Sequence, residues 1–151
     1  MANPNYRIKE FLIEDHSAVY DLWKRTQGIF ITTSDTEASI GSYLERNPGI
    51  SQIARDRQGK IVGAILGGHD GARGYIRHLA VADRCRGVGL GSQLVETVLS
   101  RLSAVGIIKC TIFVEQDNPD GKEFWIKNGW HRRAELVSYS KFLSKDITAQ
   151  H

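Results

Sequence analysis

Arg84-Cys85-Arg86-Gly87-Val88-Gly89-Leu90-Gly91-Ser92 stands between an apolar run and an amphipathic segment, and it carries three glycines at alternate positions. We call residues 84–92 the glycine loop. Glycine has no Cβ, so a backbone built from it can approach a ligand closely. A helix that begins here would also direct unpaired N–H groups and its positive dipole end at that ligand. The loop therefore predicts an anion site suited to a diphosphate.

Other interpretations of such a loop are a helix cap or a surface turn without any ligand. Two further phosphate-binding motifs do not fit the chain. No Gly-Lys-Ser/Thr follows the glycines, which argues against a P-loop, and the dinucleotide fingerprint lacks its downstream acidic residue. The pattern that remains is Arg-x-x-Gly-x-Gly between a strand and a helix.

That pattern resembles motif A of the GNAT superfamily of N-acetyltransferases. The corresponding residues here are the strand end Leu79-Ala80-Val81, then Arg86-Gly87-Val88-Gly89-Leu90-Gly91, then a helix. A second match follows at the expected separation, because residues 118–125 and 127–130 resemble the family's Asn-x-x-Ala-x-x-Phe-Tyr and Gly-Phe signature. The resemblance spans nearly the whole chain. Residues 67–71 and 140–143 look like the small bacterial YpeA-like branch.

The resemblance implies a donor, acetyl-coenzyme A, and a set of residues that hold it. The diphosphate would lie on the glycine loop, and the pantetheine arm would lie beside the fourth strand like an added strand. The implied donor-binding residues are Leu79, Ala80, Val81, Arg86, Gly87, Val88, Gly89, Leu90, Gly91, Ser92, Asn118, Phe124 and Trp125. Backbone N–H groups near Leu79 would polarise the thioester carbonyl.

Composition is compatible with one enzyme domain over residues 1–151, with an ordered core over about 6–143. Apolar residues make up 41% of the chain, and the net charge of +3 is too mild to favour a nucleic-acid partner. No run is long enough to cross a membrane. Two cysteines and an N-terminus without an apolar signal indicate a cytoplasmic protein with reduced thiols.

Periodicity and the resemblance together predict an α+β fold with about four helices and a mostly antiparallel sheet of six or seven strands. By resemblance, strands four and five diverge. The expected strands cover residues 6–11, 50–55, 61–66, 75–81 and 107–114, with two closing strands within 130–143. The expected helices begin after Asp15, at Ser34 with a Ser34–Glu37 capping box, after the glycine loop, and at 119 with Asn118 as its cap.

The general base departs from the family pattern. An alkyl ammonium has a pKa near 10.4, so at neutral pH about one amine in a thousand is free to attack and a base is needed. Many GNAT enzymes place a Glu on the fourth strand, where this chain has Arg77 and His78. His78 and Glu115 are the candidates, against a packed histidine and a solvated strand-end carboxylate. Asn118 is a helix cap and, by resemblance, a contact to the pantetheine arm or sulfur.

The acid and the acceptor site are less defined. Trp125 replaces the family's Tyr that protonates the leaving thiolate, so water or Tyr139 would do so. Phe30 and Ile31 lie in a bulky apolar stretch that either lines the acceptor site or packs on the core, and Tyr139 is a further acceptor-site candidate. No metal is implied.

The sequence therefore predicts acetyl transfer from acetyl-coenzyme A to a primary amine, either a small molecule or a peptide N-terminus. The alternative is a coenzyme A-binding regulatory or sensor domain with little turnover. Homodimers are common in the resembling superfamily, so a homodimer is also an expectation.

Overall fold

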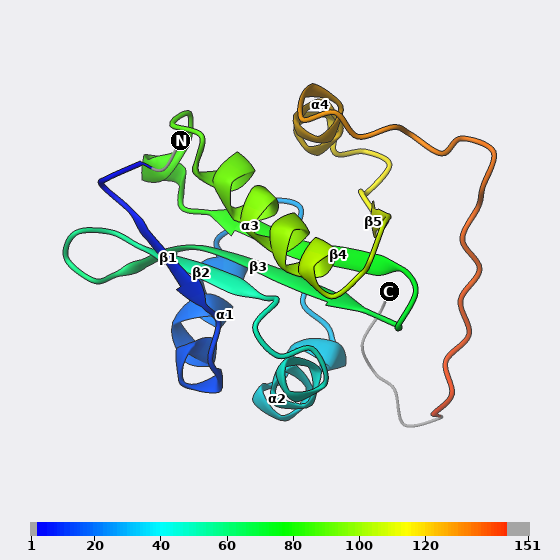
Figure 1. The fold of residues 1–151 in the computed structure, drawn as a ribbon, viewed down its shortest axis with the longest axis horizontal. Helices are drawn as coiled ribbons and strands as arrows, with labels where there is room; N and C mark the ends of the chain where they lie inside the picture. The colour runs from blue at the N-terminus through cyan, green and yellow to red at the C-terminus, as the bar shows by residue number, and fades with distance from the viewer. Residues whose placement is uncertain (1–2, 145–151) are drawn as a thin grey trace.

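The computed structural model describes residues 3–144, and Figure 1 shows how their helices and strands are arranged. The strands are β1 (Arg7–Glu10), β2 (Gln52–Arg55), β3 (Ile61–His69), β4 (Gly74–Val81) and β5 (Cys110–Ile112). The α-helices are α1 (His16–Lys24), α2 (Glu37–Arg46), α3 (Leu90–Ala104) and α4 (Pro119–Lys127). Single 3-10 turns are η1 (Ile13–Asp15), η2 (Thr33–Asp35) and η3 (Asp83–Cys85).

The five strands form one sheet in chain order, β1-β2-β3-β4-β5. The first four are antiparallel neighbours, whereas β5 runs parallel to β4 because α3 carries the chain back across the sheet. β4 and β5 pair only from Gly74 to Ile76 on one strand and from Cys110 to Ile112 on the other. The rest of β4 has no β5 partner, so the expected divergence of these strands is confirmed.

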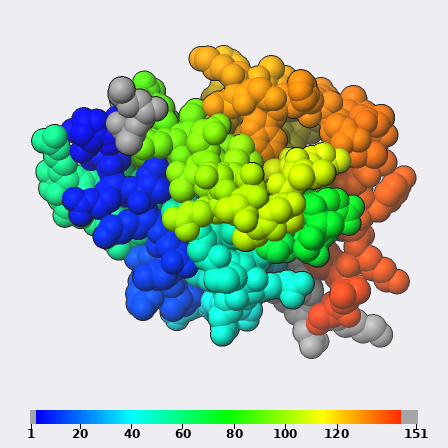
Figure 2. Space-filling model, in the orientation of Figure 1, coloured from blue at the N-terminus to red at the C-terminus, as the bar shows by residue number. Residues whose placement is uncertain are grey.

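Helices cover both faces of the sheet. α3 and α4 share one core with the sheet, in which Leu94, Val98 and Trp125 are buried. α1 and α2 share the other core, which holds Trp23 and Ile40. Figure 2 shows α3 in yellow-green across the middle of the face it covers. The amphipathic patterns of the sequence are therefore satisfied on two opposite faces.

A β-bulge interrupts the pairing of β3 with β4. Gly67 pairs with Ile76 and Leu66 with Arg77, but Ala64 pairs with Ala80, so β4 holds one extra residue opposite Ile65. His78 lies in this bulge with a φ of +55°, and it is the one non-glycine residue within 3–144 with a positive φ. Bulges of this kind turn side chains and peptide groups away from their regular alternation.

The sheet has fewer strands than predicted. β5 is three half-buried residues long rather than a strand buried on both faces, and Ile108 is 96% exposed. Residues 130–143 contain no strand, only a turn closed by the Leu136 N–H to Arg133 carbonyl hydrogen bond. Strand formation depends on tertiary pairing as well as on the local pattern and the resemblance from which these strands were predicted. The predicted domain end at residue 151 lies outside the described residues.

The structure confirms one predicted helix cap and contradicts another. α4 begins at Pro119 as expected, and Asn118 Oδ1 accepts the Gly121 N–H at 3.0 Å. The Ser34–Glu37 capping box was wrong: Thr36 caps α2, and the preceding turn is a Thr32–Asp35 capping box. Within residues 3–144 there is no helix with the length and apolar character needed to cross a bilayer.

Candidate active site

The backbone of the glycine loop is open toward solvent. Gly87 and Gly89 have φ of +79° and +84°, and a Cβ built on either would meet no atom within 4 Å. Gly89 is the N-cap of α3 and provides no side-chain cap, and no acidic residue stands in the first turn. The helix therefore presents uncapped N–H groups to an open space, as an anion site requires. The loop fits a diphosphate.

Three side chains of the loop have different partners. Arg84 is paired with Asp56 at 2.6 Å, and its hydrogen bond holds the pKa of that carboxyl below its ordinary value. Arg86 contacts only the exposed Asp83, at 3.4 Å, a surface pair that a phosphate can replace at little cost. The Ser92 hydroxyl donates to Asn128 Oδ1 at 2.8 Å, which ties α3 to α4.

The bulge decides which N–H groups face the space beside β4. Gly74 donates its N–H to Lys109, on the β5 side, so in a regular strand residues 76 and 78 would also face β5. Ala82 instead donates to Val62 of β3. The N–H groups of successive strand residues point to opposite edges. Those of Leu79 and Val81 therefore point away from β3, toward the side from which β5 has diverged. The extra residue in the bulge causes this change.

α4 lies close to two segments that are far from it in the chain. The loop between α1 and α2 passes so close to the start of α4 that a Cβ on Gly28 would lie 2.9 Å from Asn118 Nδ2. Phe124 of α4 packs beside Gly91, where a Cβ would lie 3.4 Å from its ring. Asn118 and Phe124, predicted to share a ligand with the glycine loop, thus belong to the helix that packs beside that loop.

A carboxylate that the sequence did not single out contacts the bulge in β4. Asp35 is 1% exposed, and its Oδ1 is 3.0 Å from His78 Nε2 and 3.1 Å from an Arg77 guanidinium nitrogen. Its Oδ2 accepts the Thr32 N–H at 3.0 Å, and its backbone carbonyl lies 2.8 Å from His16 Nε2. We call Asp35, Arg77 and His78 the Asp35 cluster.

The cluster exists because of the bulge. Leu79 and Val81 pack on the α3 side of the sheet and Ala80 on the α1 side, so neighbours normally alternate. Arg77 and His78 are neighbours, yet both face the α1 side, where they share Asp35. His78 also packs edge-on against Trp23, with ring centroids 4.9 Å apart. Its side chain keeps 16% of its surface exposed, so the ring remains accessible.

The charges of the cluster are balanced in favour of an ionised Asp35. Burial on its own raises the pKa of this carboxyl. The hydrogen bonds from His78 and from the Thr32 N–H, together with the positive charges of His78 and Arg77, outweigh burial and hold the pKa below its ordinary value. Asp35 is therefore a carboxylate at neutral pH, paired with one permanent cation and one titratable ring.

The structure separates the remaining predicted residues from the cluster. Glu115 is exposed after β5, and Tyr139 is 92% exposed in the segment without strands. Ile31 packs in part on the core of the α1 side, and Phe30 beside it is 49% exposed. Trp125 is 8% exposed and contacts Phe124 and Trp130 at centroid distances of 5.0 and 4.8 Å.

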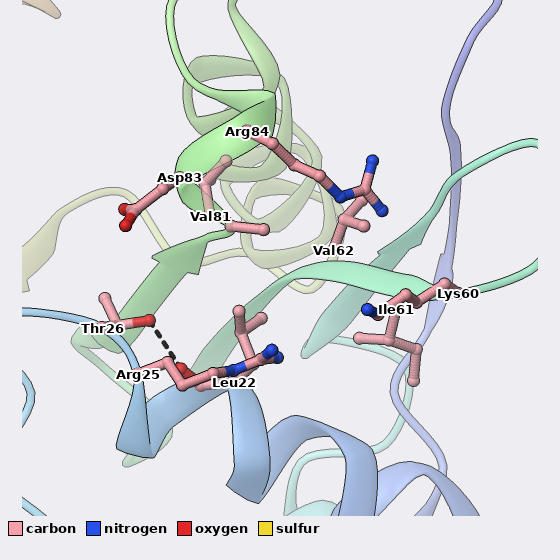
Figure 3. Close-up of a pocket in the computed structure, with 10 residues that line it drawn as sticks. Leu22, Arg25, Thr26, Lys60, Ile61, Val62, Val81, Asp83 and Arg84 are labelled. Atoms are coloured by element: carbon pink, nitrogen blue, oxygen red, sulfur yellow. Dashed lines mark hydrogen bonds between the residues drawn. The ribbon is translucent and has the colours of Figure 1, made fainter.

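A cavity of about 260 Å³ adjoins the glycine loop on the α1 face of the sheet. Figure 3 shows it between the end of α1 and the end of β4, with Arg25, Lys60 and Arg84 around it and the Asp83 carboxylate on the opposite side. These cations add to the positive field of the loop. Such a field favours the approach of a phosphorylated ligand.

Comparison with known proteins identifies the family of this chain. The sequence profile of the Acetyltransferase (GNAT) family matches residues 16–130, which include the glycine loop, the bulge and α4. The chain belongs to this family. An acetyltransferase of Sodalis glossinidius is 32% identical over 139 residues, 92% of this chain and 96% of that protein. One of Pectobacterium atrosepticum is 33% identical over 111 residues, 74% and 77% of the two chains.

Solved structures agree with this assignment. Ard1 from Thermoplasma volcanium superposes with a TM-score of 0.73 at 25% identity, covering 83% of this chain and 82% of that one. The N-acetyltransferase PaiA from Thermoplasma acidophilum, crystallised with coenzyme A, has the same fold, with a TM-score of 0.69 at 17% identity over 85% and 89% of the chains. This GNAT protein is thus an N-acetyltransferase whose acetyl donor is acetyl-coenzyme A.

Sequence reasoning missed two residues at the site of this GNAT enzyme, Asp35 and Trp23. Neither belongs to a motif, and both reach His78 only through the fold. One signal was available. Two polar residues in succession, Arg77 and His78, break the alternation of an otherwise apolar strand, and such a break indicates a bulge.

Proposed function

We propose that this GNAT enzyme transfers the acetyl group to a primary amine that enters from the α1–α2 side, with His78 as general base. One observation carries the proposal. The bulge places the His78 ring on the α1–α2 side and, one residue later, turns the Leu79 N–H toward the β5 side. A proton acceptor and an N–H donor for the thioester carbonyl therefore flank the same point of β4.

The proposed chemistry assigns each proton a place. With Nε2–H donated to Asp35, the Nδ1 lone pair of His78 accepts a proton from the ammonium of the acceptor. The freed nitrogen pair forms the bond to the acetyl carbon, and the C–S pair leaves with sulfur. The second amine proton passes through solvent to the thiolate, and His78 returns its proton to solvent. The result is an amide, free coenzyme A and one released proton.

His78 is favoured over Glu115 by its surroundings. His78 has a fixed orientation, given by Asp35 on one side and Trp23 on the other. Glu115 is exposed, and its backbone carbonyl, not its carboxylate, accepts the Asn118 N–H. A base must be held within hydrogen-bond reach of the reacting proton, which favours the fixed ring.

No side-chain acid is required for the thiolate. Trp125 is enclosed by Phe124 and Trp130, and indole is no practical acid. A thiol has a pKa near 8.5, so it can leave in part as thiolate and be protonated by water. We therefore assign Asn118 to contact with the donor arm and no acid role to Tyr139.

The acceptor is either a small amine or a peptide N-terminus, and Phe30 and Ile31 are proposed to line its entrance. Both belong to the α1–α2 loop, which also brings Gly28 to Asn118. An experiment that measures thiol release over a panel of polyamines, amino sugars, amino acids and short peptides tests the function. Turnover with one class supports it. Tight coenzyme A binding with no turnover across the panel would favour the sensor alternative.

We also propose a cytoplasmic homodimer. Both cysteines are unpaired, as in a reducing compartment. β5 is the edge of the sheet, and Leu136, Val137 and Tyr139 of the unpaired segment are at least 60% exposed. A second copy that pairs with this edge would cover them. Light scattering checks this, because Val137→Glu should leave a monomer where the unaltered chain forms a dimer.

A further inference from the structure

We propose that Asp35 is a positioning residue for acetyl transfer, which fixes the His78 ring so that Nδ1 is the nitrogen available to the acceptor. The juxtaposition that carries this is Asp35 Oδ1 at 3.0 Å from His78 Nε2, across 43 residues of sequence. The inference rests on the proposed function, because it explains how the proposed base is held.

The local structure of the α1–α2 loop does not by itself require this carboxylate to be buried. Its Oδ2 caps the Thr32 turn, which an exposed aspartate would do equally well. Asp35 is nevertheless 1% exposed, and burial of a charge is costly unless partners compensate for it. Oδ1 has those partners, Arg77 and His78, and both come from the bulge in β4. Oδ1 of Asp35 therefore binds the two side chains that the bulge brings to it.

The backbone of His78 turns its ring out of the regular alternation of β4. A φ of +55° is uncommon for a residue with a side chain, although histidine is among those that adopt it most often. Two contacts fix the ring: the Asp35 hydrogen bond and the edge-on packing of Trp23. Removal of the hydrogen bond leaves one contact, which does not define the rotation of the ring.

The groups around the ring favour one tautomer. They are Asp35 of η2 and Arg77 of β4, with His16 of α1 joined to the Asp35 backbone carbonyl and the uncharged Trp23 at its edge. An ionised carboxylate can only accept a hydrogen bond, so Asp35 holds the ring proton on Nε2 and leaves Nδ1 as the acceptor. Loss of the carboxylate charge removes this preference.

The test compares Asp35→Asn with Thr36→Ala in the full chain, by steady-state kinetics and by ¹⁵N NMR of the His78 ring at alkaline pH, which reports which ring nitrogen carries the proton. Asn keeps the size of the side chain. Thr36→Ala removes the cap of α2, whose hydroxyl accepts the Ser39 N–H at 3.2 Å, and so loosens the same loop while the side chains of the cluster are unchanged. It is a control for structural effects.

For Asp35→Asn we expect the ring to change from one tautomer, with the proton on Nε2, to a mixture of the two. The kcat should fall by about ten- to a hundredfold, as when a hydrogen-bonded partner that orients a functional histidine is lost, while KM for acetyl-coenzyme A stays unchanged. Thr36→Ala should lower Tm and leave the tautomer in place. An unchanged tautomer and kcat in Asp35→Asn, or an equal change of tautomer in Thr36→Ala, would overturn the inference.

His78→Gln separates this inference from the proposed function. Loss of turnover in His78→Gln with full turnover in Asp35→Asn overturns the positioning role alone. Full turnover in both variants refutes the proposed base, and the positioning role falls with it. Reduced turnover in both, with the change of tautomer in Asp35→Asn, supports the two together.

Discussion

The glycine loop follows the end of β4 and the Asp35 cluster forms around the bulge within β4, and the two sites are built in opposite ways. The loop presents backbone N–H groups from one continuous stretch, with Gly87 and Gly89 in the left-handed region and open space above them. The cluster presents side chains, and Arg77 and His78 are 42 and 43 residues from Asp35 in the sequence. The donor site is thus local and made of main chain, whereas the proposed base is assembled by the fold.

This difference bears on what each site can tolerate. A main-chain site depends on backbone conformation, so side-chain changes that keep φ should leave it working. A side-chain site depends on each hydrogen bond, and loss of one partner leaves the other buried and uncompensated. The following predictions either sharpen that contrast or break it.

The largest effect is expected for His78→Gln. Glutamine keeps a polar side chain but cannot accept and return a proton near neutral pH, so kcat should fall by about 10²- to 10⁴-fold. The Kd for acetyl-coenzyme A, measured by calorimetry, should not change. Glu115→Gln serves as the comparison and should keep its turnover. If Glu115→Gln loses turnover and His78→Gln keeps it, the base is Glu115 at the end of β5. The Asp35 cluster would then have no part in the chemistry.

A loss of about tenfold is expected in donor affinity for Gly89→Val. The left-handed conformation costs a residue with a side chain about 1–2 kcal/mol, and the loop would move to avoid it. Gly59→Val is a matched control, because Gly59 has the same φ of +84° and equally open surroundings, in the β2–β3 hairpin. Calorimetry should show weak binding for the first variant only. Equal affinity in both would place the diphosphate elsewhere.

A smaller effect concerns stability in acid. Because the pKa of Asp35 is lowered in the folded state, its carboxylate stabilises the fold fully above about pH 4, the ordinary unfolded value. That contribution is lost as pH falls through the lowered pKa. Asp35→Asn should therefore be less stable than the unaltered chain at pH 7, with a Tm difference that shrinks below pH 4. A constant difference would mean that the charge of Asp35 does not contribute to stability.

The smallest effect is expected for Trp125→Tyr. The ring is buried between Phe124 and Trp130, so a new hydroxyl there has no route to the leaving sulfur without repacking. Turnover should stay within about twofold while Tm falls by a few degrees, as for a core substitution near 1 kcal/mol. A clear rise in kcat would show that position 125 can supply the acid after all.

The sequence allowed the donor half of the site to be predicted because its signals are local. Glycines at alternate positions, a following amphipathic helix and the Asn118 cap each need only neighbouring residues. Asp35 could not be found in this way. Its neighbour Ser34 offered an equally plausible capping box with Glu37, and only the pairing of β4 with β3 brings His78 to it. The prediction of closing strands failed because strand formation depends on tertiary pairing, which a local pattern does not determine.

The left-handed backbone at His78 restricts laboratory evolution of this enzyme. Apart from glycine, the residues that best tolerate a φ of +55° are asparagine, aspartate and histidine, whereas valine or isoleucine would be severely strained. A library at position 78 should therefore return few well-folded members, drawn from this short set, and of these histidine alone carries the imidazole of the proposed base. A β-branched residue should remove the bulge and restore regular pairing of β4 with β3. The N–H at position 79 would then point toward β3 instead of toward the donor. One substitution would therefore change the surroundings of both the acetyl donor and the acceptor.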